Sequence, residues 1–128
     1  MRCVDSTFLI DLIQEDASAL TKAKSIVDAG EGLSIAAPAL MEILIGAHYK
    51  GGRTLRETLE RIGSLDVLEI HAEVAGEAAR IGAEMLRRGQ AVGTIDLLIA
   101  AAAKLHGHIL LTRDAGFSRI PGIAVEIY

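Results

Sequence analysis

The sequence predicts an α/β fold built on a parallel sheet. Short apolar runs alternate with amphipathic segments along the whole chain, and the short runs carry almost no polar residues. Strands that alternate with helices imply crossover connections, which pair the strands in parallel. Strands that are apolar on both faces are typical of a sheet covered by helices on both sides.

The first half of the chain predicts two strands and four helices. The first strand ends at Asp5, and Ser6 or Thr7 is expected to cap the helix that carries Phe8. Pro38 suits the first turn of a helix, and the glycines at 51 and 52 end that helix. The expected elements are, in order, a strand over 3–5, a helix over 8–13, a helix over 17–29, a strand over 33–36, and helices over 39–49 and 54–62.

The second half predicts three strands and two helices. After His71 a long helix places Val74, Ala78, Ile81 and Met85 on one apolar stripe, and it ends at Gly89. Thr94 is expected to cap the second helix. The expected elements are, in order, a strand over 67–70, a helix that follows residue 71, a helix over 95–105, and strands over 108–111 and 123–127.

Composition narrows the class of protein. The 128 residues make one domain's worth, residues 1–128, and with 51% apolar but only 3% aromatic residues the core must be aliphatic. Cys3 is the only cysteine, so we expect a buried, inert thiol and a reducing, cytoplasmic setting. No apolar run is long enough for a membrane span. The net charge of −4 argues mildly against a large phosphate-binding surface.

Four acidic residues are predicted to meet at one edge of the sheet. Asp5 closes the first strand, and Asp114 comes three residues after Leu111. Asp96 lies in the first turn of the helix that runs back into the fourth strand, and Glu42 lies in the second turn of the helix that leaves the second strand. All four positions belong to the carboxyl edge, where sites form in parallel sheets.

Each acid also has an ordinary structural explanation. Asp96 is expected near the N-terminus of a helix, where its negative charge interacts favourably with the helix dipole. Asp114 has a residue type that is common in turns. Glu42 is harder to explain in this way, because its helix is apolar nearly all round and we expect a buried carboxylate with no cation one turn away. Two carboxylates ~5 Å apart repel by roughly 3 kcal/mol at an effective dielectric constant of 20. A divalent cation removes that repulsion, and oxygen ligands favour Mg²⁺ or Mn²⁺.

The acids lie in segments that resemble the motifs of PIN-domain proteins, specifically VapC-like toxins of toxin–antitoxin pairs. The segments are VDSTFLIDLI, PALMEILIGA, GTIDLLIAAAA and ILLTRDAGF, in that order. The resemblance implies a three-layer α/β/α fold with a five-stranded parallel sheet in the order 3-2-1-4-5. It also implies a ribonuclease that uses Mg²⁺ or Mn²⁺, an RNA substrate, an inhibitory antitoxin and a homodimer.

The resemblance assigns roles to individual residues. Asp5, Glu42, Asp96 and Asp114 are the expected catalytic acids, with Asp5, Asp96 and Asp114 holding the metal. Ser6 and Thr112 match hydroxyl positions that support the site, although capping or turn bonding explains them equally well. Gly116 stands where many relatives carry a further acid, so we expect one firmly held ion. Contact with RNA is expected to use the exposed cations Lys50, Arg53, Arg56 and Arg113.

Other interpretations fit less well. A phospho-receiver needs an aspartate after the third strand and a lysine after the fifth, where this chain has His71 and Tyr128. A haloacid-type phosphatase needs an aspartate two residues after the first one, where this chain has Thr7. The stronger alternative is a catalytically weak PIN-like module that only binds protein or RNA.

Overall fold

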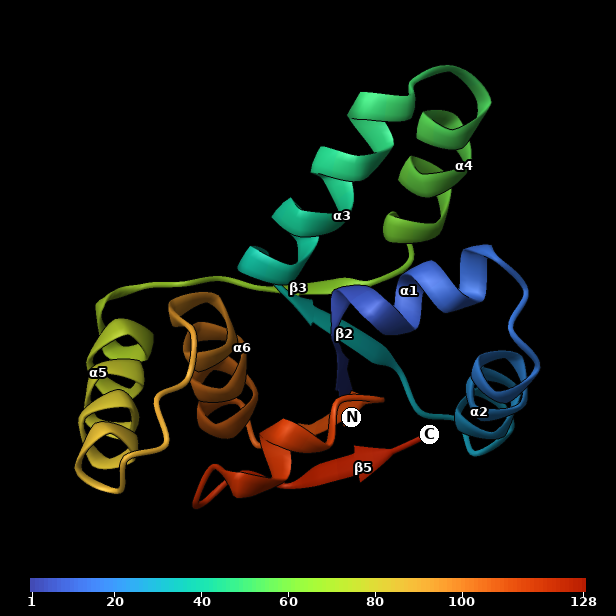
Figure 1. Cartoon of the computed structure of the whole chain (residues 1–128). Helices are drawn as coiled ribbons and strands as arrows, with labels where there is room; N and C mark the ends of the chain where they lie inside the picture. The colour runs from blue at the N-terminus through green and yellow to red at the C-terminus, as the bar shows by residue number, and fades with distance from the viewer.

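The computed structural model describes residues 1–128 and contains a five-stranded parallel sheet with the strand order β3-β2-β1-β4-β5. The predicted fold class and strand order are therefore confirmed. Six α-helices and one 3₁₀ helix connect the strands (Figure 1). The elements are β1 Arg2–Val4, α1 Ser6–Ile13, α2 Ala17–Asp28, β2 Leu33–Ala36, α3 Ala37–Lys50, α4 Gly52–Ile62, β3 Asp66–Leu68, α5 Ala72–Arg87, α6 Thr94–Leu105, β4 Ile109–Thr112, η1 Ala115–Arg119 and β5 Val125–Ile127.

The strand order reverses at β1, which pairs with β2 on one side and with β4 on the other. Val4 is in register with Ile35 of β2 and with Leu111 of β4. Helices α1 and α2 lie on one side of the sheet and α5 and α6 on the other, while α3 and α4 stand as a hairpin above its carboxyl edge (Figure 1). The residues that follow β1 and β4 are thus neighbours at the point where the chain changes direction.

One cluster of 26 buried hydrophobic residues fills the space between the sheet and its helices. Its members are mostly aliphatic, as the composition predicts, and Phe8 and Phe117 are its only aromatic rings. Cys3 is fully buried within it, which confirms that prediction, and burial raises the pKa of its thiol to about 11. No helix combines the length and the apolar composition that a membrane crossing requires.

Several predicted boundaries were wrong. Asp5, rather than Ser6 or Thr7, caps α1, because the Asp5 carboxylate accepts the N–H of Phe8. Gly93, rather than Thr94, is the cap of α6 and provides no side-chain bond. Strand β3 ends at Leu68, two residues early, and β5 begins two residues late at Val125. Neither strand has a second neighbour beyond it, and edge strands are commonly short.

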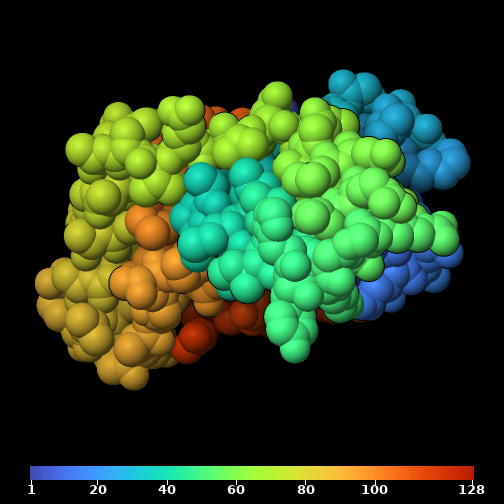
Figure 2. Space-filling model, turned by 90° about the horizontal axis from the view of Figure 1, so that it is seen from above, coloured from blue at the N-terminus to red at the C-terminus, as the bar shows by residue number.

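Helices α3, α6 and α4 lie next to one another on the face seen from above the carboxyl edge. In Figure 2, α3 (teal) occupies the middle of this face, between α4 (green) and α6 (orange), with α5 (yellow-green) beyond α6. Apolar side chains of α3 remain exposed, with Met41 at 47% and Ile45 at 63% exposure. The apolar sequence of α3 therefore reflects an uncovered surface as well as the core.

Candidate active site

Asp5 is the buried centre of the acidic group. It follows β1 directly, and only 5% of its surface is exposed. One carboxylate oxygen accepts the N–H of Phe8 at 3.0 Å, and the other accepts the hydroxyl of Thr112 at 2.5 Å. Burial raises the pKa of this carboxyl, the two hydrogen bonds partly offset that effect, and repulsion from Asp114 and Asp96 raises it further.

Thr112 connects Asp5 to Asp114. The fully buried hydroxyl of Thr112 donates to Asp5 and accepts the backbone N–H of Asp114 at 3.0 Å. Asp114 in turn accepts the N–H of Gly116 at 2.8 Å and thereby caps η1. The predicted hydroxyl position at Thr112 therefore lies between two of the predicted acids, with both of its hydrogen-bonding functions in use.

Asp96 and Asp114 line one cleft of about 140 Å³ between α6 and η1. Asp96 lies in the first turn of α6, as predicted, and is half-buried. Burial, and after it repulsion from Asp114, raises the pKa of the Asp96 carboxyl. The two acids come from segments that precede and follow β4, and the topology brings them to the same side of the sheet edge.

Glu42 corrects one prediction, because it is exposed rather than buried. Helix α3 rises above the sheet edge, so its apolar sequence does not enclose this side chain. Glu42 lines a groove between α1 and the α3–α4 hairpin, separate from the cleft of Asp96. Partial desolvation and repulsion from Asp96 and Asp5 still raise the pKa of its carboxyl, while the nearby hydroxyl of Ser6 lowers it. Ser6 therefore lies close to Glu42, and Asp5 rather than Ser6 caps α1.

The acids form an edge of mutually repelling carboxylates, since Asp5, Glu42 and Asp96 each have a pKa raised in part by another acid of the group. Their donor atoms are all oxygens, which is the set that Mg²⁺ and Mn²⁺ prefer. No three acidic, histidine or cysteine side chains converge closely enough to form a ready metal centre. The group therefore has the chemistry of a magnesium site without a closed coordination shell.

The four predicted RNA-contacting cations differ in their location and in whether they already form ion pairs within the protein. Lys50 lines the same groove as Glu42. Arg53 pairs with Glu57 one turn away at 2.7 Å, and Arg56 has no ion-pair partner. These three lie on the α3–α4 hairpin, some distance along the chain from the cleft of Asp96 and Asp114. Their role in binding RNA stays a prediction.

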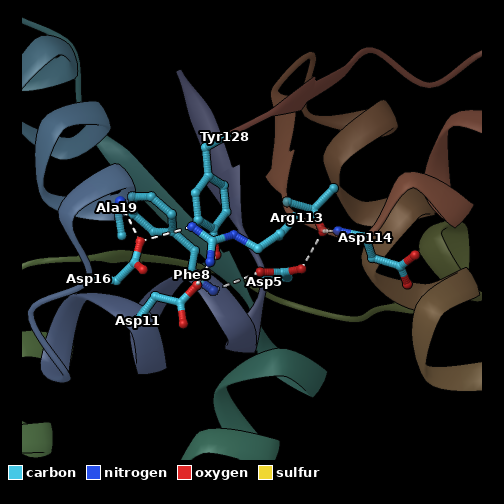
Figure 3. A network of polar contacts seen from close by, with 9 residues as sticks. Asp5, Phe8, Asp11, Asp16, Ala19, Arg113, Asp114 and Tyr128 are labelled. Atoms are coloured by element: carbon cyan, nitrogen blue, oxygen red, sulfur yellow. Dashed lines mark hydrogen bonds and ion pairs between the residues drawn. The ribbon is translucent and has the colours of Figure 1, made fainter.

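Arg113, the fourth cation, is engaged in a network that the sequence did not reveal. Its guanidinium pairs with Asp16 at 2.8 Å and with Asp11 at 3.6 Å, and it lies over the ring of Tyr128 at 4.6 Å (Figure 3). The hydroxyl of Tyr128 also donates to Asp11 at 2.7 Å. The network attaches the segment after β4 to α1 and α2, so Arg113 is positioned for structure more than for a ligand.

Arg119 is a further residue of the site that sequence reasoning missed. It lies at the end of η1 and lines the cleft that holds Asp96 and Asp114. The signal was present in the sequence, because this cation follows Asp114 by five residues in a segment without a predicted element. The turn that η1 makes after Asp114 is what returns Arg119 to the acids.

Comparison with known proteins identifies the family of this chain. The family model described as PIN domain matches residues 2–123. The chain belongs to the PIN-domain family. It is similar to the tRNA(fMet)-specific endonuclease VapC of Salmonella typhimurium, with 34% identity over 97 residues that cover 73% of this chain and 74% of that protein. The VapC of the same description from Shigella flexneri is 32% identical over a stretch of the same length.

Solved structures agree with this family at the level of the fold. VapBC2 from Rickettsia felis, bound to a DNA fragment from its promoter, contains a chain that superimposes with a TM-score of 0.86 at 20% identity, covering 99% of this chain and 98% of that one. DNA-bound VapBC from Salmonella typhimurium gives a TM-score of 0.78 at 25% identity and covers 98% of this chain and 96% of that one.

Proposed function

We propose that this protein is the toxin of a toxin–antitoxin pair and hydrolyses RNA phosphodiester bonds with the help of Mg²⁺ or Mn²⁺. The observation that carries the proposal is the linked arrangement of Asp5, Thr112 and Asp114 beside Asp96, at the point where the strand order of a PIN domain reverses. The similarity to endonucleases named VapC supports the same activity.

The acids divide into two roles in the proposed reaction. Asp5, Asp96 and Asp114 would hold the dication, and Glu42 faces the group from α3 and orients water or completes the site. Once bound, the dication would lower the pKa of a water molecule and offset negative charge on the phosphate. Thr112 keeps Asp5 and Asp114 in a fixed relation, because its hydroxyl contacts both residues. The raised pKa values of Asp5 and Asp96 mean that deprotonation and ion binding favour each other.

The test is cleavage of single-stranded RNA and of tRNA, with Mg²⁺ or Mn²⁺ and then with EDTA. We expect cleavage only with the dication, and we expect Asp96→Asn to remove it while the variant still folds. An Asp96→Asn protein that cuts as fast as the parent contradicts the proposal. Glu84→Gln is a suitable control, because Glu84 is an acid of α5 that pairs only with Arg87 and Arg88.

The proposed antitoxin is a protein segment with apolar side chains and an arginine. The groove between α1 and the α3–α4 hairpin suits such a segment, because Ile10, Ile13 and Ile43 line it and Glu42 lies along it. An arginine of the antitoxin would pair with the carboxylates in place of the dication. The homodimer stays a prediction that sedimentation or light scattering can test.

The alternative, a module that binds without cutting, has one observation in its favour: the carboxylates do not converge into a ready metal centre. Calorimetry with Mn²⁺ separates the two functions. Binding of the ion together with RNA cleavage supports the nuclease. Failure of both, with an antitoxin or RNA still bound, supports the module.

A further inference from the structure

The cleft beside the acids contains one cationic side chain. Its lining includes Asp96, Asp114 and Arg119, and the remaining lining residues carry no charge. Arg119 is exposed and forms no ion pair with any carboxylate of the protein. Its Nε donates to the carbonyl of Gly116 at 3.3 Å, and its two terminal nitrogens have no hydrogen-bond partner in the protein. The Nε atom of the guanidinium is therefore held by the protein, and the two terminal nitrogens are available to a ligand.

Gly116 lies where the side chains of Asp114 and Arg119 approach each other. A Cβ atom built on Gly116 would lie 2.9 Å from Oδ1 of Asp114, closer than real Cβ atoms come to a neighbouring atom, and 3.7 Å from a terminal nitrogen of Arg119. A larger residue at this position would therefore displace the Asp114 carboxylate, whereas glycine lets the carboxylate and the guanidinium line the same cleft.

Other cations of the chain lack this combination. Arg113 adjoins Asp114 in sequence, but its guanidinium is committed to Asp16, Asp11 and the Tyr128 ring. Arg56 and Arg61 have no ion-pair partner, yet both lie on α4 and line none of the clefts. In Figure 2 the C-terminal segment (red) reaches the rim of the face beside α6 (orange).

We propose that Arg119 binds a backbone phosphate of the RNA directly beside Asp96 and Asp114. This assignment rests on the proposed nuclease function and adds a substrate-binding residue to it. A guanidinium offers donors in a planar fork that matches two oxygens of a phosphate. Held in this way, the RNA strand lies across the cleft with an adjoining phosphodiester above the carboxylates. The protein otherwise carries a net negative charge, so one well-placed cation has a large share in retaining the strand.

The experiment compares Arg119→Gln, Arg119→Lys and Arg61→Gln. Arg61 is a matched control because it is an exposed arginine without an ion-pair partner. Binding of a fluorescent single-stranded RNA is measured by anisotropy at several salt concentrations in the Asp96→Asn background, where cleavage is removed. Cleavage constants with Mn²⁺ are measured in the parent background. Circular dichroism and urea unfolding establish that each variant is folded.

We expect Arg119→Gln to weaken RNA binding at least about 10-fold, because a hydrogen bond between a guanidinium and a phosphate is stronger than one between neutral groups. The slope of log affinity against log salt should fall by about 0.7, which corresponds to one phosphate contact on a single strand. Arg119→Lys should restore the slope but only part of the affinity. Arg61→Gln should change neither quantity, and the cleavage defect of Arg119→Gln should lie mainly in KM.

Two results would overturn the assignment while leaving the nuclease intact. One is an Arg119→Gln protein that cleaves and binds RNA with the affinity and salt slope of the parent. The other is a variant that alters only Mn²⁺ affinity in calorimetry, which would make Arg119 a counterion of Asp114. A parent protein that neither binds nor cleaves RNA refutes the nuclease function itself, and the assignment falls with it.

Discussion

At the scale of single residues, the hydroxyl of Thr112 is the connection on which the site depends. It is fully buried, donates to Asp5 and accepts from the backbone of Asp114. Removal of one partner from a buried pair leaves the other without compensation for its lost hydration. Asp5 would keep only the N–H of Phe8 as a hydrogen-bond donor to its carboxylate. The geometry of two acids therefore rests on one oxygen atom.

Thr112→Val tests this connection with little change in shape. We expect the free energy of unfolding to fall by about 1–3 kcal/mol because buried polar groups lose their partner, and we expect weaker Mn²⁺ binding. Urea unfolding and calorimetry measure the two effects. Thr58→Val is the control, because the buried hydroxyl of Thr58 donates to the carbonyl of Thr54 within α4. Equal effects of the two substitutions on Mn²⁺ binding would contradict a special role for Thr112.

Asp96→Asn tests the electrostatic cost of the acidic edge in metal-free protein. The pKa of Asp96 is raised in the folded state, so its stabilising contribution is fully present below the ordinary carboxyl pKa of about 4 and is lost as pH rises through the raised value. At pH 7 the parent bears that loss and the variant does not. We expect a higher Tm for Asp96→Asn at pH 7, with a difference that disappears toward pH 4.

Glu84→Gln should change Tm in the opposite direction in the same pH series. Hydrogen bonding to Arg87 lowers the pKa of Glu84, so its stabilisation is present above the ordinary pKa and is lost as pH falls through the lowered value. This substitution should lower Tm at pH 7 and have little effect in acid. Thermal unfolding in EDTA at a series of pH values measures both variants. A Tm of Asp96→Asn that stays below the parent throughout would show that the acids are not under electrostatic strain.

At the scale of elements, hydrophobic period and glycine position predicted nearly every helix and strand, but not what covers them. The apolar run around Glu42 has the same pattern whether a helix is enclosed or projects from a sheet edge. The exposure of Glu42 depends on tertiary placement, which periodicity does not contain. Asp5 similarly serves as both cap and site residue, and a sequence pattern does not separate these roles.

The features that the sequence did not predict depend on contacts between segments that are far apart in the chain. Arg113 looked like a free cation because Asp11, Asp16 and Tyr128 are far from it in sequence, and only the fold brings them together. Arg119 was missed because η1 has no periodic apolar pattern that would indicate its turn. The acids were found because all strands of a parallel sheet end at the same edge, and the alternation of strands and helices already indicated parallel pairing.

The turn between α3 and α4 is an element that requires glycine. Gly51 has φ of 65° and ψ of −166°, a combination that is essentially restricted to glycine. Gly51→Ala should lower the free energy of unfolding by about 1–3 kcal/mol, the usual cost of such strain. Gly46→Ala is the matched control within α3, where an added Cβ meets nothing within 4 Å. It should stabilise the protein by roughly 0.5–1 kcal/mol, because alanine favours helix. Urea unfolding measures both, and two losses of similar size would contradict the argument.

At the scale of the whole molecule, the proposed ion site predicts that the stability of the fold depends on the concentration of the dication. Three separate segments contribute the carboxylates Asp5, Asp96 and Asp114, so an ion held by all three binds only the folded chain. Mn²⁺ at 100 times its Kd should therefore stabilise the protein by about 2.7 kcal/mol. Thermal unfolding with increasing Mn²⁺ measures the shift, and Asp5→Asn should reduce it strongly. A Tm that does not respond to the ion in the parent would favour the binding module.

The pairing of β1 with β4 has a consequence for the stage of synthesis at which the proposed site is completed. Asp5 precedes its partner hydroxyl by 107 positions, and Asp114 follows that hydroxyl by two residues. A nascent chain on the ribosome can form α1 and still lack the cleft, because the last strands have not been added. A truncated product that stops before residue 112 should therefore lack the proposed ribonuclease activity.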